Sequence, residues 1–169
     1  MSAQLQPRWL LRSMVARDVP AVQAIEAGAY SFPWTRGNFI DSLAAGYIAE
    51  VLEGEAGLAG YFVAMVGVDE LHLLNVTVAL PAQGQGLGHG LLDAVQAHGQ
   101  RLHLATLLLE VRQSNERARA LYRRRGFVEV GLRRGYYPAA PGREDAVVMS
   151  LPLASLPLAA VDRGPYGLV

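Results

Sequence analysis

Residues 71–90 read LHLLNVTVALPAQGQGLGHG, and this stretch holds three structural signals in succession. Its first eight residues, Leu71–Val78, form a nearly continuous apolar run of the kind that fills a buried strand. Four glycines follow at positions 84, 86, 88 and 90. An apolar stripe with helical spacing is then made by Leu87, Leu91, Leu92 and Val95. The stretch therefore predicts a buried strand, a glycine-rich turn and a helix.

The glycine-rich turn suits an anion. Glycine permits positive φ and close approach of the backbone, and a helix start offers unpaired N–H groups at the positive end of its dipole. These properties predict a phosphate site in residues 83–88, which fit the pattern Q-x-x-G-x-G. The dinucleotide pattern G-x-G-x-x-G fails because its last position falls on His89 or Leu91, and the phosphate loop needs a lysine that the chain lacks. A glycine-rich turn that binds nothing is the alternative.

The rest of the chain alternates between strand and helix patterns. Asp18 is expected to cap the first helix, and Gly126 is expected to end the last one. The predicted strands cover residues 9–14, 47–53, 58–66, 71–78, 104–111, 127–132 and 146–151, and the predicted helices begin near residues 18, 35, 87 and 115. This order predicts an α/β fold with a mixed central sheet flanked by helices. Residues 1–151 are expected to form one domain, and residues 152–169 a loosely ordered tail.

The composition excludes several kinds of chemistry. The 169 residues include no cysteine, so disulfides, thiolate metal sites and a cysteine nucleophile are excluded. All 15 basic residues are arginines, which excludes a Schiff-base lysine. The histidines at positions 72, 89, 98 and 103 lack a metal-binding spacing, so no metal site is predicted.

Charge is unevenly distributed along a chain whose net formal charge is zero. Residues 1–100 carry four arginines and nine acids, whereas residues 101–169 carry eleven arginines and six acids. The basic second half predicts an anionic ligand, with solvated arginines on a helix surface as the alternative. The start of the chain lacks a basic-then-apolar leader, and prolines interrupt the apolar stretch Leu151–Val161. The expectation is a cytoplasmic protein that does not contact membranes.

Several short sequences occur together between residues 8 and 151. They are FPW at 32–34, LNVTV at 74–78, QGQGLG at 83–88, LEVR at 109–112, SN at 114–115, YYP at 136–138 and GRED at 142–145. In these sequences the chain resembles the GNAT superfamily of acetyl-CoA-dependent N-acetyltransferases, and within it the bacterial ribosomal-protein-alanine N-acetyltransferases. The resemblance implies a single-domain GNAT fold and acetyl-CoA as cosubstrate. It also implies acetyl transfer to the N-terminal α-amino group of a protein, an alanine of a small-subunit ribosomal protein.

The resemblance also implies where acetyl-CoA binds. The edge of the strand before the glycine turn is expected to pair with the pantetheine amides and to offer backbone N–H groups to the thioester oxygen. The expected cofactor-binding residues are Val76, Thr77, Val78, Gly84, Gln85, Gly86, Leu87, Gly88, His89 and Asn115. For Asn115, plain capping of a helix is the alternative. The family usually has arginine in place of Gly84 and often in place of His89, so weaker phosphate binding is expected.

Glu110 is the candidate general base. About one-tenth of protein α-amino groups are neutral at pH 7, so removal of the amine proton assists attack. Glu110 follows Leu107, Leu108 and Leu109 at the end of an apolar strand, and a carboxyl group desolvated in this way holds a proton more readily. The resemblance implies the same role. A solvated glutamate at a strand end is the alternative.

Tyr122 is the candidate general acid. A thiol with a pKa of about 8.5 leaves more easily when it receives a proton, and a phenol with a pKa near 10 still carries one at pH 7. The resemblance implies that the tyrosine of the Leu121-Tyr122 pair points at the sulfur. Packing of the Tyr122 ring on Phe127 is the alternative.

The peptide substrate is expected to contact aromatic side chains. Aromatic walls exclude water around a short extended N-terminus, which selects Phe32, Trp34, Tyr136 and Tyr137. For Trp34, packing in the core is an equal alternative. An acetyltransferase for a small amine and an acetyl-CoA-binding module without catalysis are the other functions considered. The Tyr-Tyr-Pro sequence argues against the small amine, and the presence of both catalytic candidates argues against the module. Nucleic-acid binding would rest on the arginine content alone and is not expected.

Overall fold

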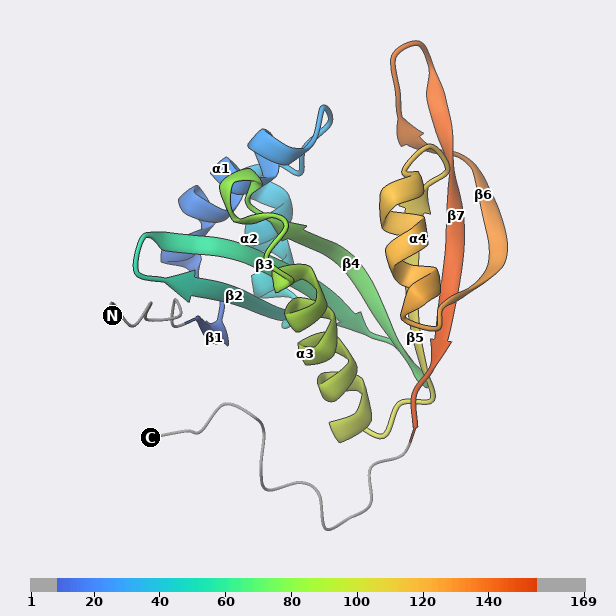
Figure 1. The fold of residues 1–169 in the computed structure, drawn as a ribbon, viewed down its shortest axis with the longest axis horizontal. Helices are drawn as coiled ribbons and strands as arrows, with labels where there is room; N and C mark the ends of the chain where they lie inside the picture. The colour runs from blue at the N-terminus through green and yellow to red at the C-terminus, as the bar shows by residue number, and fades with distance from the viewer. Residues whose placement is uncertain (1–8, 155–169) are drawn as a thin grey trace, which may run out of the picture. The chain divides into compact units, whose positions relative to one another are not determined.

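The computed structural model describes residues 9–154 (Figure 1). Within them, seven strands form one sheet in the order β1-β2-β3-β4-β5-β7-β6. The strands are β1 (Leu10–Ser13), β2 (Ile48–Gly54), β3 (Gly57–Val66), β4 (Glu70–Val78), β5 (Thr106–Arg112), β6 (Val128–Pro138) and β7 (Arg143–Pro152). The helices are α1 (Val19–Ala29), α2 (Arg36–Ala44), α3 (Leu87–Arg101) and α4 (Glu116–Arg124), with 3-10 turns η1 (Ala16–Asp18) and η2 (Leu80–Ala82). β4 and β5 run parallel, whereas the other pairs with a described register are antiparallel, which confirms the predicted α/β fold with a mixed sheet.

The described chain divides into two compact units. The first unit holds residues 9–65 and 74–93, and the second unit holds residues 66–73 and 94–154. β4 and α3 each contribute residues to both units. Most of the predicted tail, residues 155–169, lies outside the described residues. Within residues 9–154, no helix has the length and apolar character needed to cross a membrane.

In the first unit, α1 and α2 pack against the hairpin formed by β2 and β3. The core between them consists of fully buried side chains: Val19, Val22, Phe39, Val51, Tyr61 and Val63. α1 carries Pro20 in its first turn, where a missing N–H costs nothing. Thr35 caps the start of α2, and its hydroxyl accepts the Asn38 N–H at 3.3 Å. Local sequence signals therefore determine where both helices start.

Asp18 does not cap α1 through its side chain, contrary to the sequence prediction. The turn η1 runs directly into α1, and Asp18 already has right-handed helical dihedral angles. Its carboxylate points back along the chain, where it accepts the Val15 N–H at 2.9 Å and pairs with Arg12 at 2.8 Å. The hydrogen-bonded Arg12 guanidinium holds the pKa of Asp18 below its ordinary value. Asp18 therefore ties β1 to the turn before α1.

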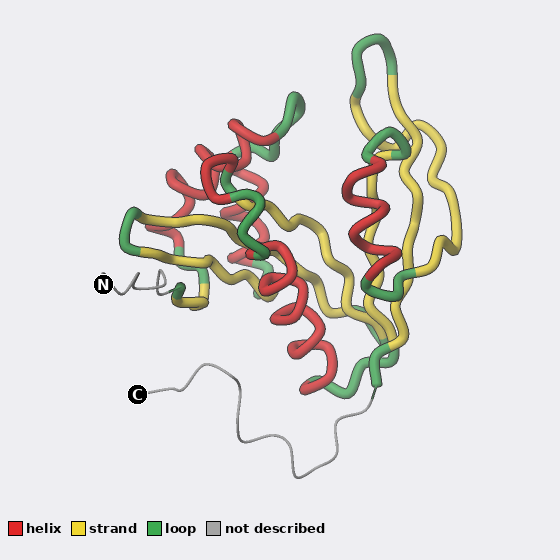
Figure 2. Tube along the Cα trace, viewed as in Figure 1, coloured by secondary structure: helices red, strands yellow, loops and turns green. Residues whose placement is uncertain are grey.

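In the second unit, β5 and β7 are neighbouring antiparallel strands (Figure 2). Their ladder is regular and places Glu110 opposite Val148. Leu107, Leu109 and Met149 of this ladder are fully buried. α4 follows β5 and ends as predicted before Gly126, whose φ of +95° suits glycine after the last helical turn. The sheet and helix thus bury one face of β5.

The β6–β7 hairpin extends beyond the predicted strands at 127–132 and 146–151. Polar side chains form hydrogen bonds with the backbone of this hairpin. Asp145 accepts the Gly135 N–H at 2.7 Å, and Arg143 donates to the Tyr136 carbonyl at 2.8 Å. Because these bonds depend on the paired partner strand, the apolar pattern of either strand alone does not reveal them.

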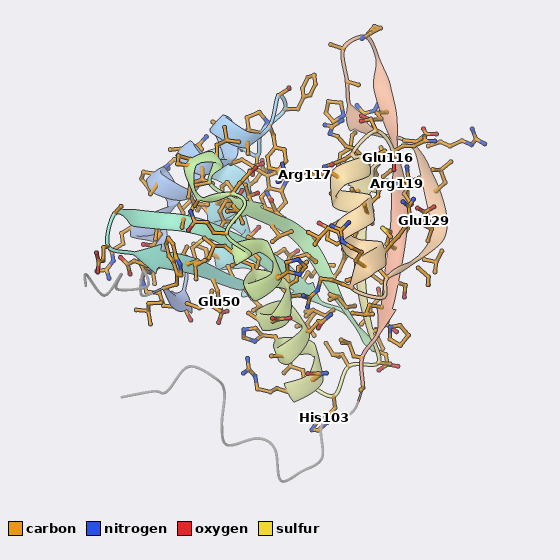
Figure 3. The ribbon with its side chains drawn as sticks, viewed as in Figure 1. Glu50, His103, Glu116, Arg117, Arg119 and Glu129 are labelled. Carbon is orange, nitrogen blue, oxygen red and sulfur yellow. The ribbon has the colours of Figure 1, made fainter. Side chains whose placement is uncertain are left out.

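β6 is an outer strand of the sheet and is exposed along most of its length. Its pairing with β7 shifts register twice, between residues 129 and 131 and between residues 133 and 137. Glu129 joins β6 to α4 through Arg119 at 2.9 Å and Arg123 at 2.6 Å, and Glu116 pairs with the same Arg119 (Figure 3). These ion pairs lie on the surface of the second unit.

Candidate active site

The glycine turn has the backbone conformation that an anion site requires. Gly84 and Gly86 both have φ of +79°, and a Cβ atom at either position would meet no atom within 4 Å. Conformation rather than crowding therefore explains why glycine stands at both positions. α3 begins at Leu87 directly after the turn, so the N–H groups of its first turn follow the glycines. Backbone amides arranged in this way are able to bind an anion, and the phosphate site itself stays a prediction.

The turn is joined to the end of β4. The Gln83 side-chain amide donates to the Val78 carbonyl at 3.1 Å, and a Cβ atom on Gly88 would lie 3.9 Å from a Val78 methyl group. The first unit thus brings two groups of predicted cofactor-binding residues together, Val76–Val78 and Gly84–His89. Asn115 lies in the second unit, where its side chain accepts the Ala118 N–H at 3.1 Å. The capping alternative for Asn115 is confirmed, and its contact with the cofactor stays a prediction.

A buried polar network lies beside β4, and it was not predicted from the sequence. Glu26 is 2% exposed and accepts the Trp34 N–H at 2.8 Å, the Asn75 amide at 3.2 Å and the Tyr61 hydroxyl. Burial, together with the negative charge of Glu26, raises the pKa of Tyr61, so this phenol keeps its proton. A signal was present in the sequence, because Glu26 occupies an apolar position of α1.

A second part of this network contacts the backbone of β4. The Tyr30 hydroxyl lies 3.2 Å from the Val76 carbonyl and 3.0 Å from the Thr77 hydroxyl. Thr77 is 4% exposed and donates to the Asn75 side chain at 3.1 Å. Burial raises the pKa of Tyr30, so this hydroxyl also stays protonated. The network holds the predicted cofactor-binding strand from its buried side.

The two aromatic candidates of the first unit differ in exposure. The Trp34 ring lies 5.3 Å from the Phe39 ring and packs against the core, which agrees with the packing alternative. Phe32 is 44% exposed. The loop that carries both residues therefore presents one aromatic ring to the core and one to solvent.

In the second unit, Glu110 has polar partners in place of the apolar surroundings that the sequence suggested. Its side chain is 6% exposed, and the Arg133 Nε–H lies 3.0 Å from one carboxylate oxygen. The His72 Nε2 contacts the other oxygen. His72 lies in β4 opposite Leu108, and Arg133 lies in β6, so both partners come from strands distant in sequence. The solvated alternative for Glu110 is wrong.

Tyr136 and Tyr137 are the tyrosine candidates in β6. Burial raises the pKa of Tyr137, and the charge of Glu110 adds to the increase. The Tyr136 and Tyr137 rings are 5.0 Å apart, and the Arg112 guanidinium lies 4.6 Å from the centre of the Tyr137 ring. The second unit therefore places the Tyr136 and Tyr137 rings edge to face, with Arg112 beside Tyr137.

Tyr122 is 8% exposed and packs on Phe127, with the two ring centres 5.5 Å apart. The predicted packing contact is present. The role of Tyr122 as a general acid stays a prediction. Over residues 9–154, no group of three or more histidine, aspartate or glutamate side chains forms a metal site.

The comparison with known proteins covers nearly the whole described chain. Residues 19–127 match the sequence profile of the acetyltransferase (GNAT) family. The [ribosomal protein bS18]-alanine N-acetyltransferase of Escherichia coli K12 is 39% identical over 144 residues, which are 85% of this chain and 97% of that protein. The enzyme of the same name from Haemophilus ducreyi is 33% identical over 143 residues, covering 84% of this chain and 99% of the relative.

Solved structures agree with this match. The crystal structure of the Escherichia coli ribosomal-protein-S18-alanine N-acetyltransferase superposes with a TM-score of 0.82 at 37% identity, covering 89% of this chain and 97% of that one. Arabidopsis thaliana Naa50, solved with the bisubstrate analogue CoA-Ac-MVNAL, shares the fold with a TM-score of 0.74 at 19% identity, over 85% and 97% of the two chains. This chain belongs to the acetyltransferase (GNAT) family.

Proposed function

We propose that the protein transfers the acetyl group of acetyl-CoA to the N-terminal α-amino group of a ribosomal protein of the small subunit, at an alanine. The observation that carries the proposal is the glycine turn, with Gly84 and Gly86 at φ +79° before α3, in a chain 39% identical to a bS18-alanine N-acetyltransferase. The names of the relatives support the substrate, and a ribosomal substrate implies a cytoplasmic location.

Acetyl-CoA is proposed to bind along Val76–Val78 and the glycine turn. Backbone amides of residues 84–88 would hold the pyrophosphate beside His89, whose own N–H already donates to the Gly86 carbonyl at 3.1 Å. Asn115 would add a polar contact. Because Gly84 and His89 replace arginines common in the family, binding of the pyrophosphate would rely on amide dipoles more than on side-chain charge. The edge of β4 would offer N–H groups to the thioester oxygen as it gains negative charge.

The proposed reaction is a direct transfer. Glu110 removes a proton from the α-amino group, and the nitrogen lone pair attacks the thioester carbonyl carbon. The C–N bond forms and the C–S bond breaks. Tyr122 gives its phenolic proton to the departing thiolate. Before the next turnover, Glu110 releases the proton that it accepted to solvent, and water restores the proton of Tyr122. The polar partners and 6% exposure of Glu110 support the assignment, since a buried carboxylate with fixed hydrogen bonds has a defined orientation.

The substrate N-terminus is proposed to contact the aromatic side chains of Phe32, Tyr136 and Tyr137. Tyr136 and Phe32 are 43% and 44% exposed, so part of each ring faces solvent. Trp34 supports the loop through its packing on Phe39 and through its backbone bond to Glu26.

The test is acetylation of defined N-termini. The purified protein is incubated with acetyl-CoA and the proteins of the small ribosomal subunit, and acetylated N-termini are identified by mass spectrometry. We expect one acetyl group on an N-terminal alanine, and no transfer to the same peptide when its α-amino group is already blocked. Transfer to small amines alone would overturn the protein substrate. Absence of heat when acetyl-CoA is titrated in a calorimeter would overturn acetyl-CoA binding.

A further inference from the structure

His72 is a half-buried histidine that the proposed reaction does not use. It lies in β4, its side chain is 16% exposed, and its Nε2 contacts an oxygen of Glu110. An imidazole in an apolar strand needs a reason to be there, because a leucine would fill the same position without a buried polar group to satisfy. Its contact with the proposed base supplies that reason.

Two donors engage the two oxygens of Glu110. His72 contacts one oxygen and the Arg133 Nε–H reaches the other at 3.0 Å. A carboxylate only accepts hydrogen bonds, so the His72 ring carries its proton on Nε2 while Glu110 is ionised. Each carboxylate oxygen has two lone pairs, and one donor per oxygen leaves lone pairs for a substrate proton.

We propose that His72 is a positioning residue that fixes the plane of the Glu110 carboxylate for proton removal from the substrate amine. The inference rests on the proposed function, because it requires Glu110 to be the base. Arg133 alone does not fix the plane, since its side chain is 54% exposed and a single bond leaves the carboxylate free to rotate. The second bond, from the less exposed His72, removes this rotation. A base held in a productive orientation accepts a proton faster than a rotating one.

The first experiment separates orientation from other roles of the ring. His72→Gln keeps a side-chain N–H donor, whereas His72→Leu removes it. We expect His72→Leu to lower kcat about 10-fold, a part of the 10²–10⁴-fold that a placed base contributes, with the KM for acetyl-CoA unchanged. His72→Gln should restore most of kcat. Loss in both variants to the same extent would overturn the inference, because it would mean that a titrating ring is needed.

A double-mutant cycle tests whether His72 acts through Glu110. In a Glu110→Gln background, His72→Leu should change kcat by less than 2-fold, as residues that act as one unit do not add. Multiplied losses would overturn the inference. His103→Asn is the matched control, since this exposed histidine has φ of +55°, which asparagine tolerates, and it should keep wild-type kcat.

The variants also separate the two proposals. If Glu110→Gln keeps wild-type kcat, the proposed base is wrong and the positioning role is wrong with it. If Glu110→Gln is impaired while His72→Leu is not, only the positioning role is wrong. Thermal unfolding of each variant identifies a loss of fold, and His72→Gln keeps the test decisive if His72→Leu unfolds.

Discussion

The Glu26 carboxylate accepts a hydrogen bond from the Trp34 backbone N–H at 2.8 Å, so a buried acid of α1 holds the loop that leads into α2. The same carboxylate accepts from Asn75 in β4 and Tyr61 in β3. One side chain of α1 thus connects the loop that follows it with β3 and β4.

We expect Glu26→Ala to lower the free energy of unfolding by about 3 kcal/mol. The substitution removes the acceptor of the buried Tyr61 hydroxyl and of two half-buried donors, the Trp34 N–H and the Asn75 amide. An unsatisfied buried donor costs roughly 1–3 kcal/mol, without full additivity. Urea denaturation measures the change. Glu55→Ala, at an exposed turn position, is the control and should stay within about 0.5 kcal/mol of wild type. Equal changes in the two variants would contradict the network's role.

Glu110→Gln should lower kcat about 100-fold at neutral pH and leave the affinity for acetyl-CoA nearly unchanged. Glutamine has a similar shape but accepts protons poorly, and the proposed cofactor-binding strand does not include residue 110. Steady-state kinetics on an alanine-initiated peptide and calorimetric titration of acetyl-CoA measure the two quantities. A variant with wild-type turnover would remove Glu110 from the mechanism.

Tyr122→Phe keeps the ring that packs on Phe127 and removes only the hydroxyl. Release of the thiol should therefore slow by about 100-fold if the phenol supplies the proton, while the melting temperature changes little. A thiol-reactive dye follows free CoA in real time. Release of the thiol at the wild-type rate would show that Tyr122 has a packing role alone.

Gly86→Ala should weaken acetyl-CoA binding and cost about 1–2 kcal/mol of stability, because an L side chain at φ +79° is strained. Calorimetry and urea denaturation measure the two effects. Gly28→Ala is the control, since Gly28 lies inside α1, has no atom within 4 Å of its Cβ position and lacks a positive φ. It should be neutral or stabilising by up to about 1 kcal/mol. Unchanged affinity in Gly86→Ala would show that acetyl-CoA does not use this turn.

Acid should destabilise the first unit through Asp18. Its pKa is lowered in the folded state by Arg12, so this contribution is complete above the ordinary aspartate pKa of about 4 and is lost as the pH falls through the lower folded value. The free energy of unfolding is measured at intervals from pH 6 down to pH 2. Asp18→Asn should show a flatter profile at the acid end. An identical slope in the variant would mean that other carboxyl groups account for the acid sensitivity.

The elements could be predicted where the pattern is local. Apolar periodicity located the strands and helices, and Asn115 and Gly126 marked the ends of α4. The surroundings of Glu110 could not be predicted, because His72 is 38 residues away and Arg133 lies on another strand. The prediction for Asp18 was wrong for a related reason. Aspartate is a residue type that caps helices, but the Asp18 carboxylate accepts the Val15 N–H of the preceding turn. Contacts between distant segments are set by tertiary packing, which one-dimensional patterns do not contain.

An outer strand with unpaired backbone groups is a template on which a second chain can add and start aggregation. β6 occupies such a position and carries exposed Val128, Val130 and Leu132. Its two register shifts with β7 interrupt the straight row of N–H and C=O groups that an added strand would need, and Arg133 and Arg134 put charge on the same edge. The irregular hairpin therefore makes β6 a poor template for an added strand, although apolar side chains of β6 face water.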